Sequence, residues 1–134
     1  MDLLIQAARD ARERAYAPYS QYLVGASVQG SDGNIYSGCN VENISYGLSI
    51  CAERNAIFQM VAAGCRELTA VAVVTKDGGT PCGACLQVMS EFVGKGEQVW
   101  VHCASEGVEC NSILLSDMIP YGFQSDEVRR NVVE

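Results

Sequence analysis

The sequence has no long hydrophobic run and is short of basic residues. No apolar stretch approaches the roughly 20 residues that a membrane-spanning helix needs. Nine Lys and Arg stand against sixteen Asp and Glu, so the 134 residues carry a formal net charge of −7. Nucleic acids and anionic membranes are captured by basic surfaces. These two shortages argue against a membrane protein and against a protein that binds DNA or RNA.

Proline is scarce too, with three residues, and no tract has a biased composition. A disordered protein would have a different composition. Hydrophobic residues make up 49% of the sequence, which is enough to build a core, and the length suits a single domain over residues 1–134. The first residues do not have the pattern of a signal peptide, and we therefore expect a cytoplasmic protein.

Cysteine, by contrast, is plentiful, with seven residues. An odd number without a secretion signal is a poor match to a disulfide framework. In a reducing compartment, clustered cysteines more often bind a metal or take part in catalysis. The spacing of the cysteines along the chain is therefore the feature to examine.

The first forty residues have the periodicities of a helix and a hairpin. Residues 2–16 place apolar side chains at helical spacing, and Pro18 lies just beyond the expected end of this helix. Residues 23–29 and 35–41 predict two strands. The intervening Ser31-Asp32-Gly33-Asn34 contains an Asp-Gly step, which is typical of a β-hairpin turn.

Helices and strands alternate in the rest of the chain, after a loop over residues 43–49. The expected elements are a helix over 51–64, a strand over 68–75, a helix over 83–93, a strand over 97–104 and a short helix over 112–118. The strand over 68–75 is almost wholly apolar, as strands buried on both faces are. This alternation predicts a sheet with parallel segments and helices on both faces.

The first informative cysteine spacing lies in Pro81-Cys82-Gly83-Ala84-Cys85. Two cysteines three residues apart in the first turn of a helix lie on one face, so both sulfurs can reach one ion. The partial positive charge of a helix N-terminus favours the thiolates that metals require. Alone, the motif could also be a redox dithiol or a pair of ordinary cysteines.

Cys51 also stands at the start of a predicted helix, and Glu53 follows two residues later. Taken singly, Cys51 would be a small buried residue and Glu53 an exposed acid that stabilises the helix dipole. Together with Cys82 and Cys85, they predict a metal site with three protein ligands. A zinc site with three protein ligands and an open position is typical of catalysis.

At this point the chain resembles a known family. Cys51-Ala52-Glu53-Arg54, followed by the motif over 81–85, resembles the motif of zinc nucleobase deaminases. Further motifs are similar to those of the small homotetrameric cytidine deaminases: Val24-Gly25-Ala26, Gly38-Cys39-Asn40-Val41-Glu42-Asn43 and Ser45-Tyr46-Gly47. The resemblance extends from Tyr16 to Phe123. It implies an α/β fold of three αβα layers, with helices on both faces of a mixed five-stranded sheet.

The resemblance also implies a reaction, a cofactor and partners. The reaction is hydrolytic deamination of cytidine and 2′-deoxycytidine by a zinc-activated water, with release of ammonia, as in pyrimidine salvage. One Zn²⁺ per chain would be held by Cys51, Cys82 and Cys85. Glu53 would carry protons to N3 of the pyrimidine and to the leaving amino group. Arg54 would hydrogen-bond the cysteine sulfurs. The partners are the nucleoside and further copies of the chain.

Four of the expected nucleoside contacts lie in the first half of the chain. Asn40 and Glu42 are two residues apart at a strand end and so face the same side. In the resembling family this pair holds the ribose 3′-hydroxyl, which both nucleosides carry. The backbone at Ala52 would meet the base. Tyr22 stands where the family usually has a Phe that stacks on the pyrimidine, and it keeps the aromatic face.

Two aromatic residues have expected roles at the edge of the pocket. Phe123 resembles a C-terminal aromatic residue that closes it, and Tyr46 resembles a loop residue that reaches the site of a neighbouring subunit. The chain departs from the family pattern at two positions. Leu86 replaces a common Arg after the second CxxC cysteine, and Ile44 replaces a small residue in the loop that contacts the next subunit.

The other cysteines have no partner at metal spacing and are expected to be ordinary small apolar residues: Cys39, Cys65, Cys103 and Cys110. His102, the one histidine, lies on a predicted strand far from these motifs and is not expected to be a ligand.

Three other functions share part of this pattern. A blasticidin S deaminase has the same zinc motif, but Asn40-Val41-Glu42-Asn43 and Ser45-Tyr46-Gly47 favour cytidine. A deaminase that edits polynucleotides needs a basic groove, which an acidic chain does not offer. A structural zinc module that binds another protein would need a fourth protein ligand and would give Glu53 no role. An absorbance assay with cytidine separates the last of these from an enzyme.

Overall fold

The computed structural model describes residues 1–107 and 109–123. Within these residues, five strands form one sheet in the order β2-β1-β3-β4-β5. The strands are β1 (Gly25–Gly30), β2 (Ile35–Cys39), β3 (Leu68–Val74), β4 (Trp100–Ala104) and β5 (Cys110–Leu114). β3 and β4 are parallel, and every other neighbouring pair is antiparallel. The sheet is therefore mixed, as the resemblance implied.

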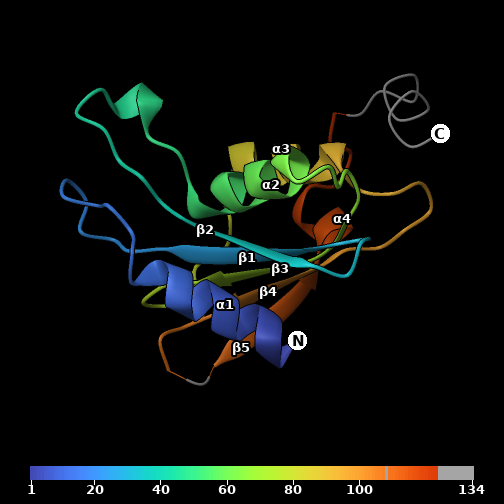
Figure 1. The fold of residues 1–134 in the computed structure, drawn as a ribbon, viewed down its shortest axis with the longest axis horizontal. Coiled ribbons are helices and arrows are strands. Elements are labelled where there is room, and N and C mark those ends of the chain that lie inside the picture. The colour runs from blue at the N-terminus through green and yellow to red at the C-terminus, as the bar shows by residue number, and fades with distance from the viewer. Residues whose placement is uncertain (108, 124–134) are drawn as a thin grey trace.

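Helices cover both faces of this sheet (Figure 1). α1 (Asp2–Arg12) lies on one face. α2 (Ala52–Ala62) and α3 (Gly83–Glu91) lie on the other, with the short α4 (Leu115–Met118) beside them. A single 3-10 turn, η1 (Tyr46–Leu48), stands on a loop that projects from the body. The expected three-layer αβα architecture is confirmed. In the described residues, no helix combines the length and the apolar character that crossing a membrane requires.

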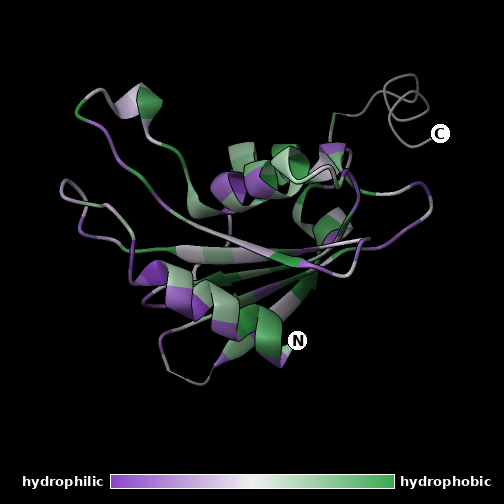
Figure 2. Ribbon diagram, in the orientation of Figure 1, coloured by the Kyte–Doolittle hydropathy of each residue, from purple (hydrophilic) through white to green (hydrophobic). Residues whose placement is uncertain are grey.

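Two cores hold the layers together. The larger lies between the sheet and the α2–α3 layer, where Ile57, Met60 and Met89 are fully buried. The smaller joins α1 to the opposite face through Leu4 and Ala8. Figure 2 shows the corresponding hydrophobic stripe along the central strands. Burial of these apolar side chains is the main stabilising contribution to such a layered fold.

Two glycines let the helices approach the sheet closely. A Cβ at Gly25 on β1 would lie 2.0 Å from the Ala8 carbonyl oxygen of α1. A Cβ at Gly38 on β2 would lie 2.6 Å from the Ala56 nitrogen of α2. Both positions therefore need a residue without a side chain. The contact at Gly38 fixes where α2, which begins directly after Cys51, sits on the sheet.

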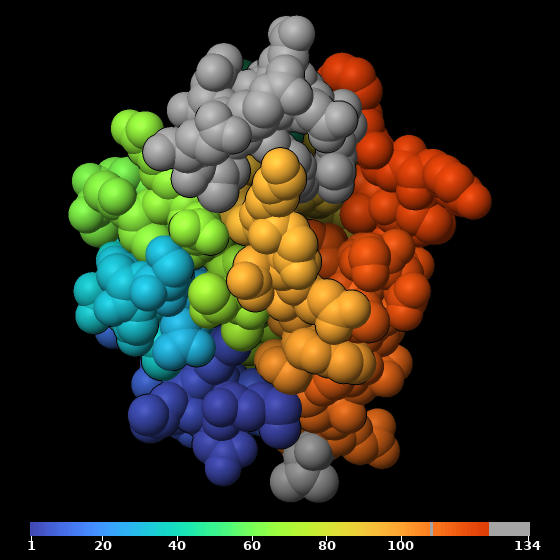
Figure 3. Space-filling view, turned by 90° about the vertical axis from the view of Figure 1, so that its right-hand side faces the viewer, coloured from blue at the N-terminus to red at the C-terminus, as the bar shows by residue number. Residues whose placement is uncertain are grey.

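The hairpin forms at the expected turn, with Gly33 in the left-handed region at φ 83°. The hairpin turn, the segment after α2 and the loop after α3 lie side by side at one end of the molecule (Figure 3). The backbone nitrogen of Ser31 donates to the carbonyl oxygen of Glu67 at 2.9 Å, and Glu67 also lies against Gly94. These contacts anchor the ends of α2 and α3 that lie farthest from their cysteines.

Two expected elements were wrong in part. The first helix ends at Arg12 rather than at residue 16, because Tyr16 forms a bridge with Val41 beside the sheet. The segment 112–118 is not one helix: residues up to Leu114 form most of β5, and only Leu115–Met118 is helical. Pairing with the free edge of β4 overrides the helical pattern there, and His102 Nδ1 lies 2.7 Å from Ser112 Oγ across the pair.

Candidate metal centre and active site

The three cysteines of the two motifs meet at the starts of two helices. Cys51 and Cys82 each occupy the N-cap position, with extended backbone, directly before α2 and α3. Cys85 lies in the first turn of α3. The exposed N–H groups and the dipole of both helices therefore point toward the sulfurs, which favours thiolates.

The sulfur positions fit a single zinc ion. The three Sγ atoms all lie within 4.8 Å of one another. The Sγ atoms of Cys51 and Cys82 are 3.8 Å apart, and those of Cys82 and Cys85 are 3.5 Å apart. Tetrahedral zinc–thiolate bonds of about 2.3 Å place neighbouring sulfurs about 3.8 Å apart. Among the described residues, this cluster can hold a metal ion with little rearrangement.

The cluster is buried on one side only. Cys85 is fully buried, Cys51 is half-buried and Cys82 is exposed. The side formed by Cys82 is therefore accessible from solvent. A metal site with one accessible side can bind a small molecule there, as catalytic zinc sites do.

Charge in the cluster is distributed unevenly. A hydrogen bond from Cys85 lowers the pKa of the Cys51 thiol, and the same contact raises the pKa of Cys85. Arg54 Nη2 donates to Cys51 Sγ at 3.5 Å, and this contact raises the pKa of the guanidinium. The buried Nε of Arg54 has no acceptor among the described residues. Arg54 is thus a cation placed against the thiolates.

Glu53 is a carboxyl group buried beside the sulfurs. It lies in the first turn of α2, and only 4% of its surface is exposed. Burial, together with the smaller effect of the nearby Cys51, raises the pKa of Glu53 to about 7. A carboxyl group with a pKa near neutrality can both accept and donate a proton, which is the property of a general acid–base.

Asn40 and Glu42, which the sequence placed together, both contact the segment that carries Tyr22. The amide of Asn40 donates to the Tyr22 carbonyl oxygen at 2.9 Å and accepts from the Val24 nitrogen at 3.0 Å. The carboxylate of Glu42 accepts from the Ser20 nitrogen at 3.1 Å and from the Ser20 hydroxyl, which lowers the pKa of Glu42. These residues hold the segment from Ser20 to Val24 in place.

Tyr22 has a partner that the sequence did not reveal. Its hydroxyl donates to Asp77 Oδ1 at 2.7 Å. The residue is partly accessible to solvent, with 39% of its surface exposed. Asp77 lies in the loop between β3 and α3, four residues before Pro81. No motif points to Asp77. The signal was the unusual Tyr at position 22, because a phenol needs a hydrogen-bond partner where a Phe does not.

The remaining expected nucleoside contacts are of two kinds, one buried beside the cluster and two exposed. Ala52 is fully buried at the start of α2, beside Cys51 and Glu53. Tyr46 and Phe123 are instead exposed, by 76% and 82%. The Tyr46 ring packs edge-on against Tyr19 at 6.1 Å. Only the backbone of Phe123 is held, by Gln87 Nε2 at 2.8 Å.

With this geometry in view, the comparisons with known proteins are decisive. Residues 2–102 match the family model described as the cytidine and deoxycytidylate deaminase zinc-binding region. The chain belongs to this family. The zinc-binding region that gives the family its description includes the cysteine cluster, so the resemblance and the expected zinc cofactor are confirmed.

Relatives match along almost the whole chain. A cytidine deaminase of Halalkalibacterium halodurans is 41% identical over 128 residues, which cover 94% of this chain and 96% of that protein. One of Sporosarcina psychrophila is 38% identical and covers 96% and 94%. The crystal structure of a cytidine deaminase from Burkholderia pseudomallei has a TM-score of 0.81 at 45% identity, covering 91% of this chain and 98% of that one. One from Mycobacterium tuberculosis has a TM-score of 0.77 at 36% identity, covering 92% and 97%.

Proposed function

We propose that this protein hydrolyses cytidine and 2′-deoxycytidine to uridine and 2′-deoxyuridine and releases ammonia. The observation that carries the proposal is the buried carboxyl group of Glu53 beside three convergent cysteine sulfurs. The relatives named cytidine deaminases support the substrate.

Cys51, Cys82 and Cys85 would hold the zinc ion, in agreement with their spacing. When bound, zinc supplies an activated water as the nucleophile for C4 of the pyrimidine. Arg54 would offset part of the negative charge of three thiolates through its bond to Cys51. The accessible side of the cluster, formed by Cys82, is the side from which the base would enter.

Glu53 would carry the protons of the reaction. Its carboxylate takes a proton from the attacking water and gives it to N3 of the base, which makes C4 electrophilic, and the water oxygen adds to C4. The carboxylate then takes the proton of the new C4 hydroxyl and gives it to the amino group, so that the C4–N bond breaks, ammonia leaves and the C4 carbonyl forms. Burial raises the pKa of Glu53 to about 7, so both the acid and the base are populated near neutral pH. The backbone at Ala52 would orient the base against this carboxyl group.

Recognition of the nucleoside would rest on the segment that Asn40 and Glu42 hold. These two residues would bind the ribose 3′-hydroxyl with the hydrogen-bonding capacity that remains to them, and the Tyr22 ring would stack on the pyrimidine. Because both nucleosides carry the 3′-hydroxyl, both should be substrates.

Two proposed contacts need a second copy of the chain. Tyr46 and Phe123 are exposed in one chain, and the Tyr46 loop also exposes Ile44 and Leu48. Exposed apolar side chains gathered on one loop are typical of an interface. We therefore propose that the protein is a homotetramer in which Tyr46 reaches the active site of a neighbouring chain. We also propose that the protein is located in the cytoplasm.

An absorbance assay tests the proposal. The purified protein, loaded with one zinc per chain, is given cytidine, deoxycytidine, cytosine and the 5′-monophosphate of deoxycytidine. We expect turnover of the two nucleosides and little of the free base. Zinc-loaded protein that deaminates neither nucleoside would contradict the proposed function and favour a structural zinc module.

A further inference from the structure

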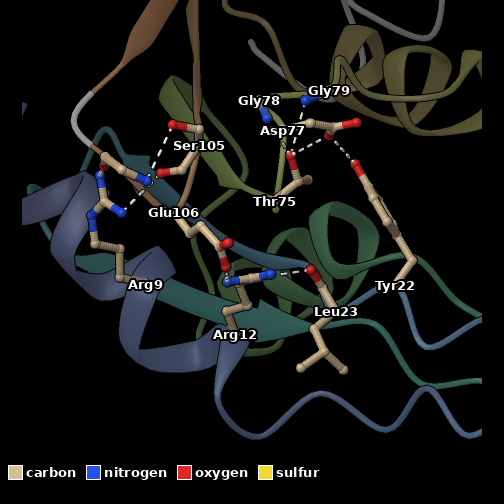
Figure 4. A network of polar contacts seen from close by, with 11 residues as sticks. Arg9, Arg12, Tyr22, Leu23, Thr75, Asp77, Gly78, Gly79, Ser105 and Glu106 are labelled. Atoms are coloured by element: carbon tan, nitrogen blue, oxygen red, sulfur yellow. Dashed lines mark hydrogen bonds and ion pairs between the residues drawn. The ribbon is translucent and has the colours of Figure 1, made fainter.

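A hydrogen bond joins Tyr22 to a loop 55 positions away in the sequence. The Tyr22 hydroxyl donates to Asp77 Oδ1 at 2.7 Å, and Figure 4 shows the ring rising from its segment to reach this carboxylate. Burial raises the pKa of the Tyr22 phenol and the contact with Asp77 raises it too, while the same contact lowers the pKa of Asp77. A charge-assisted bond of this length is stronger than a bond between neutral groups.

The loop that presents Asp77 is itself held in shape. Thr75, which is buried at the end of β3, accepts from the backbone nitrogens of Gly78 at 2.8 Å and Gly79 at 2.9 Å. Its hydroxyl lies 3.3 Å from Asp77 Oδ1 (Figure 4). Gly79 lies against the phenol, since a Cβ there would come within 3.0 Å of the Tyr22 hydroxyl. The same loop continues to Cys82, so the acceptor for Tyr22 and a cysteine of the cluster share one short segment.

The other side of Tyr22 is held at its backbone. Asn40 bonds the Tyr22 carbonyl oxygen, and Glu42 bonds the backbone at Ser20. Between them Gln21 adopts φ 58°, an uncommon conformation for a residue with a side chain. Asn40 and Glu42 thus hold the backbone of this segment, whereas Asp77 holds the hydroxyl end of the half-exposed Tyr22 ring.

We propose that Asp77 is a positioning residue that holds the Tyr22 ring in the orientation needed to receive the pyrimidine. This inference rests on the proposed function. A phenol bonded at its hydroxyl has lost most of its rotational freedom before the nucleoside arrives, so less conformational entropy is lost on binding. In this role Asp77 acts on the nucleoside through Tyr22.

The test measures cytidine binding without turnover. In the Glu53→Gln background, the Kd for cytidine is determined by calorimetry for Tyr22→Phe, Asp77→Ala and the double variant. We expect each single change to weaken cytidine binding roughly 3- to 10-fold. The double variant should bind cytidine as tightly as the single variant with the lower affinity, because the two residues act through one hydrogen bond. In the active enzyme the same changes should raise KM by a similar factor and leave kcat within about twofold.

Two further variants separate positioning from a general structural effect. Asp77→Asn keeps an oxygen acceptor for the phenol and should recover most of the affinity lost in Asp77→Ala. Tyr36→Phe removes the hydrogen bond from Tyr36 to Asp32 at the hairpin turn, an equivalent tyrosine–aspartate pair away from the site, and should leave Kd unchanged.

The outcomes distinguish this inference from the proposed function. The positioning role would be overturned if Asp77→Ala left the Kd for cytidine unchanged. It would also be overturned if Asp77→Ala weakened cytidine binding as much in the Tyr22→Phe background as in the presence of Tyr22. In either case, deamination of cytidine by the unaltered enzyme would leave the proposed function standing. Absence of cytidine deamination by the unaltered zinc-loaded enzyme would overturn the proposed function and this inference with it.

Discussion

The metal cluster and the proposed nucleoside contacts differ in one respect: a single chain forms the whole cluster, but only part of the set of nucleoside contacts. Three cysteine sulfurs and the buried Glu53 converge within a single chain, on the first turns of two helices packed on the sheet. Tyr46 and Phe123, by contrast, are exposed and touch none of these groups. The chemistry is therefore built into the fold, whereas recognition is shared between a loop network and, we propose, neighbouring chains. Substitutions in the two regions should consequently have different kinds of effect.

The largest effect is expected from removing two sulfurs of the cluster. Cys82→Ala combined with Cys85→Ala should abolish both activity and zinc retention, because one thiolate does not hold zinc through dialysis. Metal analysis should find about one zinc per chain in the unaltered protein and none in the variant. Cys110→Ala, which removes an exposed cysteine outside the cluster, is the matched control and should keep its zinc. Full zinc in the double variant would refute the ligand assignment.

Glu53→Gln should separate chemistry from metal binding. The amide is close in size to the carboxyl group but cannot carry protons, so turnover should fall by at least about 10²–10⁴-fold while fold and zinc remain. Glu91→Gln changes an exposed acid at the far end of α3 and should not alter turnover. A Glu53→Gln enzyme that keeps a tenth of normal turnover would be incompatible with a proton-carrying role.

The same contrast explains what the sequence could predict. Cys82 and Cys85 lie in one helical turn, and Glu53 lies two residues from Cys51, so local spacing was sufficient within each motif. Cys51 and Cys82 are 31 positions apart, and the prediction that the two motifs meet rested on their shared place at helix starts and on the resemblance. The Tyr22–Asp77 bond joins residues 55 positions apart that share no motif, and only the fold brings them together. Roles that depend on other chains, such as that of Tyr46, rest on the resemblance alone.

The fold was predictable to a similar extent and for similar reasons. The strand after α2 is predicted by its run of apolar residues, and the hairpin is predicted by the Asp-Gly step in its turn. β5 does not, because it lies at the edge of the sheet and its residues Asn111 and Ser112 are polar. Its pairing with β4 depends on tertiary contacts that no local pattern contains. The first helix was overextended because the Tyr16–Val41 bridge that interrupts it is also a long-range contact.

Arg54→Gln should have an intermediate effect. Its guanidinium bonds Cys51, and the position where the family commonly has a second arginine holds Leu86, which is packed in the core. Loss of the cation leaves the net negative charge of zinc with three thiolates less well compensated, so turnover should fall roughly 10- to 100-fold while zinc is retained. Steady-state kinetics on zinc-assayed protein would measure this. Arg66→Gln, an exposed arginine after α2, is the control, and equal turnover in the two variants would contradict the role of Arg54.

The smallest effect is expected at Tyr46, and it tests whether recognition is shared between chains. Tyr46→Ala should raise the KM for cytidine roughly 3- to 10-fold without changing kcat, because the residue is proposed to contact the nucleoside and not the reacting atoms. The exposed ring packs on Tyr19 but on no group of the cysteine cluster of its own chain. If it acts in a neighbour's site, its loss should be repaired by a neighbour that still carries it.

Mixed assemblies make that repair measurable. Tyr46→Ala chains are co-expressed with an excess of Glu53→Gln chains, so that each active site with an intact Glu53 is surrounded by chains with an intact Tyr46. The KM of the mixture should return toward that of the unaltered enzyme. Partners that carry both Glu53→Gln and Tyr46→Ala should give no such return. A KM that stays high with either partner would mean that Tyr46 serves the site of its own chain, and the proposed sharing of the site between chains would be wrong.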